Sequence, residues 1–118
     1  MKESVFQVIA TSLAKKLGIE DRVIFSRKKK LVCRGVDKKL MIGAYCSPIG
    51  KKRYKIVIDS SIRDREVVIG LLVHEIAHVL CFRRRNPHGN GWGRAYARAY
   101  RACLDMYSDW TQDKGEQE

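Results

Sequence analysis

The stretch from Val67 to Phe82 constrains the fold more than any other part of this sequence. Its sixteen residues carry one formal charge, Glu75, and two histidines, His74 and His78, and almost all the others are apolar. This composition predicts a helix that is buried on most of its sides. In such a helix a carboxylate is costly unless it is paired, hydrogen-bonded or close to a metal ion. Packing alone therefore gives no reason for Glu75.

The two histidines and the glutamate have the spacing of a metal site. His74 and His78 are four residues apart, so their imidazoles lie one above the other on one face of a helix. Glu75 points to the adjoining side of the same surface. His-Glu-x-x-His on a helix is the zincin arrangement, in which two imidazoles bind zinc and the glutamate is the general base for the zinc-bound water. The alternative is ordinary core and loop histidines, but a core histidine seldom comes with an adjacent buried glutamate.

A third histidine is available to complete the metal site. His88 follows His78 after nine intervening residues, and the chain has no other histidine beyond these three. A catalytic zinc ion takes three protein ligands and keeps a fourth position open. We therefore expect His74, His78 and His88 to hold one zinc ion per chain, with Glu75 as the catalytic base. The metzincin spacing differs, and a gluzincin would need a downstream acid, for which Asp105 is the best-placed residue.

The net charge is large for a chain of this length and predicts a polyanionic partner. The 118 residues are 45% hydrophobic, enough for one compact domain, and carry a formal net charge of +11. The segment from Ser26 to Lys55 contains eleven basic side chains and a single acidic one, Asp37. Lysines also protect strand edges from aggregation, but this excess is larger than edge protection requires. We expect a nucleic-acid-binding surface whose affinity falls steeply with salt. Its candidate residues are Arg27, Lys28, Lys29, Lys30, Lys51, Lys52 and Arg53.

The cysteines and the hydropathy pattern indicate a cytoplasmic protein. No apolar run free of charges and histidines approaches the roughly 18 residues that a membrane span needs. The four cysteines form no Cys-x-x-Cys pair, which excludes a zinc ribbon and favours free thiols in a reducing compartment. A disulfide between Cys33 and Cys46, across a hairpin, is the minor alternative.

Hydrophobic periodicity predicts a helix followed by a small sheet. An amphipathic helix that Gly18 ends is predicted from Ser4 to Leu17 by apolar residues spaced by four, at Val5, Ile9, Leu13 and Leu17, with Val8 and Ala14 widening the stripe. Residues 22–59 read as strands with short connections, and the last three strands imply an antiparallel meander. The strands are expected at 23–25 (a short strand or a lead-in), 31–36, 40–46 and 54–58, with a turn at 47–50.

Two further helices complete the expected α+β domain. Ser61 and Asp64 have the spacing of a capping box, which would start the histidine-bearing helix. Periodicity predicts a last helix at 92–107, and the acidic residues 109–118 are expected to form a frayed tail. The domain at 1–108 would then contain an N-terminal helix, a three- to four-stranded antiparallel sheet, the His-Glu-x-x-His helix and a closing C-terminal helix.

A second motif completes a family resemblance. The chain contains His74-Glu75-x-x-His78 and then His88-Gly89-x-x-Trp92. This combination resembles the SprT-like (Spartan-type) zinc metallopeptidase domain, whose third zinc ligand is a histidine followed by glycine, with an aromatic residue three positions further on. The order of the expected elements also fits. The resemblance implies a zincin-like minimal metalloprotease, cytoplasmic and associated with DNA, that lays an extended protein substrate along a sheet edge above the zinc.

The function expected from motif and resemblance is a zinc-dependent endopeptidase in which a zinc-bound water, activated by Glu75, attacks the peptide bond. Tyr96, Tyr100 and the nearby arginines are candidates for stabilising the oxyanion. Two other functions remain open: a zinc-stabilised nucleic-acid-binding module with weak or no protease activity, and a partner-binding regulator that keeps the fold as a scaffold. We expect single-stranded DNA or DNA-bound protein as the partner, no membrane, and a monomer.

Overall fold

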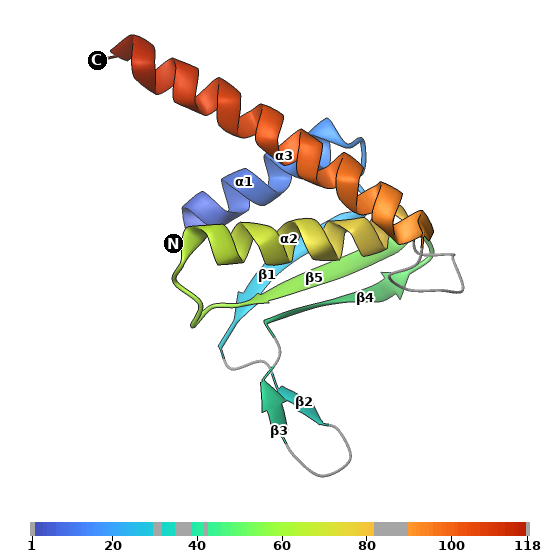
Figure 1. The fold of residues 1–118 in the computed structure, drawn as a ribbon. Helices are drawn as coiled ribbons and strands as arrows, with labels where there is room; N and C mark the ends of the chain where they lie inside the picture. The colour runs from blue at the N-terminus through green and yellow to red at the C-terminus, as the bar shows by residue number, and fades with distance from the viewer. Residues whose placement is uncertain (1, 30–31, 35–38, 42, 82–89, 118) are drawn as a thin grey trace.

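The fold is a small α+β arrangement of three helices and a mixed sheet. The computed structural model describes residues 2–29, 32–34, 39–41, 43–81 and 90–117. Its elements in chain order are α1 (Glu3–Lys16), β1 (Val23–Lys28), β2 (Val32–Arg34), β3 (Lys39–Met41), β4 (Ala44–Gly50), β5 (Arg53–Asp59), α2 (Arg65–Leu80) and α3 (Asn90–Gln117). The three helices lie on one side of the sheet, and the β2–β3 hairpin lies away from them (Figure 1).

The sheet is mixed, which corrects the predicted antiparallel meander. Its strand order is β1-β5-β4, with β5 parallel to β1 and antiparallel to β4. Among the described strands, β2 and β3 pair with each other as a separate two-stranded antiparallel sheet. The physical reason lies in β5, whose last four residues, 56–59, are all buried. A strand buried in this way belongs at the centre of a sheet, where both of its edges are hydrogen-bonded.

The predicted turn at 47–50 is also wrong, because these residues belong to β4. The true turn follows at Lys51 and Lys52, and Lys52 has a φ of 59°. Proline at position 48 suggested a turn, but β4 is an edge strand, where a missing backbone N–H is tolerated. The Ser-Pro-Ile-Gly sequence at 47–50, which is typical of a turn, therefore forms part of an edge strand.

Helix α1 forms where the apolar periodicity placed it, and most of the predicted apolar stripe is buried. Ile9, Leu13, Ala14 and Leu17 are buried as expected. Phe6 is buried in place of Val5 and Val8, which are 38% and 56% exposed. Spacings of three and four residues from Phe6 define the face that meets the sheet. Gly18 adopts a φ of 74°, the left-handed conformation that ends helices.

Helix α2 begins later than predicted, and α3 ends later. The Asp64 carboxylate accepts hydrogen bonds from the backbone N–H groups of Glu66 and Val67, so Asp64 itself is the cap. Ser61 instead donates to the Asp59 carboxylate, which removes it from the predicted capping box. Helix α3 runs to Gln117, past the end predicted at residue 107.

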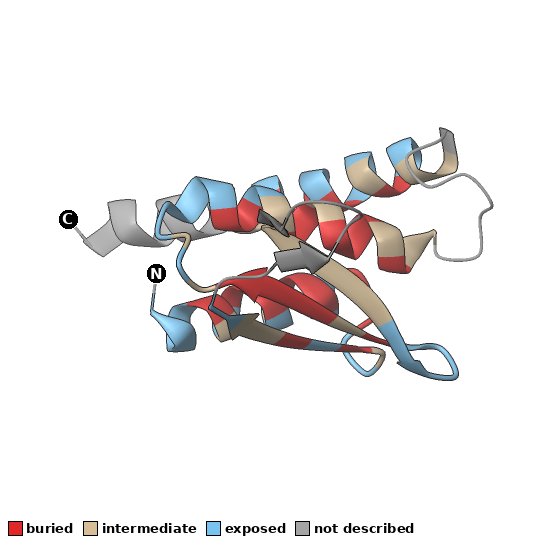
Figure 2. Ribbon diagram, turned by 90° about the horizontal axis from the view of Figure 1, so that it is seen from below, coloured by how far each residue is buried: buried red, intermediate tan, exposed pale blue. Residues whose placement is uncertain are grey.

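The core lies between the sheet and the helices. Figure 2 shows the buried residues concentrated along the facing sides of these layers. The largest fully buried side chains include Phe6 and Leu13 of α1, Ile56 of β5, and Leu72 and Ile76 of α2. The buried side chains of Leu72 and Ile76 thus hold α2 against the core both before and after residue 75 along the helix. Among the described residues, no helix combines the length and apolar character required to cross a bilayer.

Candidate metal site

The candidate site is built on the second half of α2. Leu72, Val73 and Ile76 are buried against the core, and this burial fixes the rotation of the helix about its axis. In that orientation His74 and His78 are half-buried on one face, and Glu75 turns toward the interior. Packing of the apolar residues therefore decides where the three polar side chains point.

The two imidazoles converge at the distance that a shared zinc ion would require. Nε2 of His78 lies 3.3 Å from Nε2 of His74, and the rings meet edge to face with centroids 5.0 Å apart. Two nitrogens that are each about 2.0–2.1 Å from one tetrahedral zinc ion are about 3.3–3.4 Å apart. A direct hydrogen bond between the rings would be long at this distance, because N–H donors usually approach acceptors to about 2.7–3.2 Å.

Glu75 is a buried carboxyl group without a hydrogen bond to any described residue. It is 7% exposed, and burial raises its pKa from the usual 4.5 to about 7. A carboxyl group with this pKa exchanges a proton near neutral pH, as a general base must. Its position on the turn that also presents the imidazoles puts this proton exchange beside them.

Strand β4 runs along the same site. The thiol of Cys46, in the middle of β4, has its pKa raised to about 12, first by burial and then by the negative charge of Glu75. This electrostatic effect places Cys46 close to the carboxylate. The sequence favoured a free thiol at Cys46, with a disulfide to Cys33 as the minor alternative, and gave Cys46 no place in the site. Cys46, Cys81 and Cys103 are free thiols, as the spacing of the cysteines favoured.

Helix α3 packs an aromatic ring against the histidine pair. The centroid of the Trp92 ring lies 5.0 Å from that of His74 and 5.8 Å from that of His78. Tyr96 follows at 5.0 Å from Trp92 (centroid to centroid), and Tyr100 lies 6.1 Å beyond Tyr96 in a stacked arrangement. The tryptophan of the second motif is thus brought to the histidine pair of the first.

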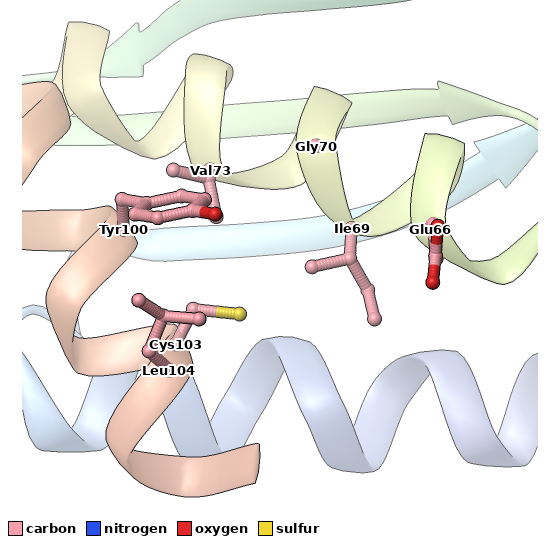
Figure 3. A pocket seen from close by; sticks show the side chains of 7 residues that line it. All are labelled: Glu66, Ile69, Gly70, Val73, Tyr100, Cys103 and Leu104. Carbon is pink, nitrogen blue, oxygen red and sulfur yellow. The ribbon is translucent and has the colours of Figure 1, made fainter.

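The two tyrosines named as oxyanion candidates are at different distances from the imidazoles. Tyr96 is one ring contact away from them, through Trp92, and Tyr100 is two. The Tyr100 side chain lines an apolar cavity of about 380 Å³ between α2 and α3. Figure 3 shows Tyr100 of α3 beside Val73 of α2 in this cavity, with Leu104 on the same helix as Tyr100. Tyr96 is therefore the better placed of the two.

The third predicted ligand, His88, lies outside the described residues. Among those that the structure describes, no group of three or more histidine, cysteine, aspartate or glutamate side chains is arranged to hold a metal ion. His74 and His78 are the two predicted ligands that the structure describes. Completion of a three-ligand site thus depends on the segment 82–89 between α2 and α3.

The seven predicted nucleic-acid contacts separate into two groups. Strands β1 and β5 are parallel, with Val23 beside Tyr54 and Lys28 beside Asp59. Lys28 and Lys29 are therefore exposed at one end of the sheet, whereas Lys51, Lys52 and Arg53 are exposed at the other. Lys30 lies outside the described residues. The six candidates that the structure describes therefore do not form one continuous surface.

Arg27 is engaged inside the molecule. Its guanidinium donates hydrogen bonds to the backbone carbonyl oxygens of Asp59, at 3.0 Å, and Ile62, at 2.7 Å. It also lies over the ring of Phe6, 5.5 Å from the centroid. These contacts tie β1 to the connection that leads into α2. Among the seven candidates, Arg27 has a structural role that charge counting could not reveal.

Comparison with known proteins adds no relative. Neither a protein-family model, nor a curated protein, nor a solved structure matches the chain. The functional argument therefore rests on the residues and on the geometry described above.

Proposed function

We propose that this protein is a zinc-dependent endopeptidase of the SprT-like type that acts in association with DNA. One observation carries the proposal: Nε2 of His74 and Nε2 of His78 lie 3.3 Å apart, next to the buried Glu75 carboxyl. A pair of core histidines needs neither this separation nor a neighbouring carboxyl group that is costly to bury. A zinc peptidase needs both.

The residues fit the metal. His74, His78 and His88 would hold the zinc ion, and imidazole nitrogens are among its preferred ligands. Bound there, zinc supplies a Lewis acid that polarises the substrate carbonyl and makes water more acidic. The ring of Trp92 packs against both described imidazoles and restricts their movement. Such restriction favours metal binding because less freedom is lost when the ligands close on the ion.

Glu75 is the proposed catalytic base. Its pKa of about 7 lets the carboxylate accept a proton from the attacking water at neutral pH. The protonated group then donates this proton to the leaving amine as the peptide bond breaks. A nearby cation favours the carboxylate form, so a bound metal shifts Glu75 toward the state that accepts a proton.

The substrate is proposed to bind along β4. This strand is an edge of the described three-stranded sheet, and Cys46 in its middle lies close to Glu75. An extended peptide that pairs with a sheet edge is held by main-chain hydrogen bonds, largely independent of its side chains. This mode suits an enzyme that cleaves protein substrates of varied sequence.

Association with DNA is proposed from charge. The chain has a net charge of +11, and the exposed residues Lys51 and Lys52 form the turn between β4 and β5, with the exposed Arg53 at the start of β5. Figures 1 and 2 place this turn toward the same end of the molecule as the junction of α2 and α3. A nucleic acid bound at that end would lie near the peptide-binding edge.

The test is cleavage of casein and self-cleavage by the zinc-loaded protein, with and without single-stranded DNA. Wild type is expected to cleave, and Glu75→Gln, which keeps the shape but loses the base, is expected not to. Glu66→Gln is the matched control, because Glu66 is exposed on the first turn of the same helix. No cleavage by wild type, with zinc and DNA still bound, would replace the peptidase by a zinc-stabilised binding module.

A further inference from the structure

Two cavities lie along the junction of α2 and α3, and they differ in chemistry. The larger, apolar cavity was described above with Tyr100. The smaller has a volume of about 210 Å³, and none of the described residues that line it is acidic. It is lined by Leu80, Cys81, Gly91, Arg94, Ala95 and Arg98. Two of the six lining residues are arginines, so the smaller cavity is suited to an anion.

The two arginines of the smaller cavity lie on one flank of α3. Arg94 and Arg98 are four residues apart, so their side chains lie one turn from each other on the same side of the helix. Both are exposed, while Ala95 and Ala99 anchor this turn in the core. Within the described part of the chain, neither guanidinium is held by an ion pair or a hydrogen bond. The pair is therefore available to a ligand.

The smaller cavity is close in sequence to the candidate metal site. Leu80 and Cys81 come two and three residues after His78 at the C-terminal end of α2, and Gly91 precedes Trp92 near the start of α3. None of His74, His78 and Trp92 lines the cavity itself. The same end of the molecule also has the basic β4–β5 turn (Figures 1 and 2).

We propose that the Arg94–Arg98 cavity binds a backbone phosphate of a nucleic-acid strand. This inference rests on the DNA association proposed above and assigns it a site. Guanidinium groups bind phosphate oxygens through two parallel hydrogen bonds, and two of them one turn apart can clamp one anion. A lipid surface fits less well, because none of the large exposed apolar side chains lines this cavity.

The experiment is a salt titration of binding to a labelled single-stranded oligonucleotide, followed by fluorescence anisotropy. The site variant is Arg94→Gln/Arg98→Gln, because glutamine keeps helix propensity close to that of arginine. For single strands each phosphate contact contributes about 0.7 to the slope of log affinity against log salt. Because the cavity is proposed to hold one phosphate, we expect the site variant to lower the slope by about 0.7 relative to wild type.

A charge-matched control separates a site from diffuse attraction. Arg63→Gln/Arg65→Gln removes two exposed arginines at the opposite end of α2, about 20 Å from Leu80. An unchanged slope in this control, together with the loss in the site variant, supports the cavity. Equal losses in both variants, or no loss in the site variant, overturn it.

The zinc content and circular dichroism of each variant establish that it is folded. Arg94→Lys/Arg98→Lys keeps both charges, so it is expected to retain the wild-type slope. If wild type binds the oligonucleotide but the site variant keeps the wild-type slope, the phosphate site at Arg94 and Arg98 is wrong, whereas the DNA association proposed above stands. If wild type binds no nucleic acid, the proposed DNA association fails with it, while casein cleavage still tests the peptidase.

Discussion

At the scale of single residues, Glu75 is the position that packing explains least. Glu75 is 7% exposed on a helix whose other buried positions are all apolar. The protein would be more stable with a neutral residue there, so a buried carboxyl group indicates chemistry. The spacing of Glu75 from the two histidines is read directly from the sequence. The burial of Glu75 followed from the apolar character of the same segment, and this expectation holds in the fold.

The raised pKa of Glu75 predicts how the metal-free protein responds to pH. Because the pKa in the fold, about 7, exceeds the usual 4.5, the folded state binds this proton more tightly than the unfolded chain. Stability contributed by this group is therefore lost as pH rises from about 4.5 to about 7, by at most about 3 kcal/mol. Glu75→Gln is expected to match wild type at pH 4.5 and to be more stable at pH 8.

Urea unfolding of the zinc-free proteins at the two pH values measures this difference. The contributions of the other titrating groups to the free energy of unfolding cancel when wild type and variant are compared at the same pH. Glu66→Gln, on the exposed face of the same helix, is expected to show no such gain at pH 8. A Glu75→Gln protein that follows the pH dependence of wild type would show that burial does not perturb this carboxyl group.

Arg27 provides a second prediction at this scale. Its two hydrogen bonds to the carbonyl oxygens of Asp59 and Ile62 are lost in Arg27→Met, which keeps most of the apolar stem. We expect the free energy of unfolding to fall by about 1–3 kcal/mol, as for hydrogen bonds to charged groups. Lys28→Met removes the same charge from an exposed neighbour and is expected to change stability little. Equal effects of the two substitutions in urea unfolding would contradict the structural role of Arg27.

At the scale of the elements, helices were predictable and the sheet was only partly so. The periodicity of α1 and the apolar run of α2 act within a few residues, so the sequence alone contains enough information to place them. The parallel pairing of β1 with β5 joins Val23 to Tyr54, a contact between segments far apart in the chain. No local pattern encodes which strand takes the central position, and so the antiparallel meander was the wrong topology.

The start of α2 gives a prediction about a single element. The Asp64 carboxylate accepts hydrogen bonds from two backbone N–H groups of the first turn. Asp64→Ala is therefore expected to lower the free energy of unfolding by about 1 kcal/mol, the usual value for a lost helix cap. Thermal unfolding followed by circular dichroism measures it. A fully stable Asp64→Ala protein would mean that the first turn is held by tertiary contacts instead.

At the scale of the whole molecule, the positive charge is divided between two ends. Composition predicted a basic protein, but composition does not state where along parallel strands the charges are exposed. Lys28 and Lys29 lie at the end where β1 and β5 finish, and Lys51 and Arg53 lie where β5 begins. The second end is the one that Figure 1 places near the start of α3. Proximity to the candidate site thus distinguishes two groups that looked alike in the sequence.

This division predicts unequal contributions to DNA binding. Lys51→Gln/Arg53→Gln is expected to flatten the salt dependence of single-stranded DNA binding, since these side chains share an end with the candidate site. Lys28→Gln/Lys29→Gln removes the same charge at the far end and is expected to have the smaller effect. Binding isotherms over a range of salt concentrations compare the two. The reverse order would place the nucleic acid at the end away from α3.

The central claim is that the histidine pair on α2 is a zinc site, and zinc titration against a chromophoric chelator tests it most directly. Wild type is expected to bind one zinc ion per chain. His74→Gln and His78→Gln are each expected to lose more than about a hundredfold in affinity, since even second-shell substitutions cost about 10- to 100-fold. His88→Ala is expected to weaken binding as well, and Glu66→Gln to leave it unchanged. A wild-type protein that binds no zinc, or pair variants that bind it as tightly as wild type, would contradict the account.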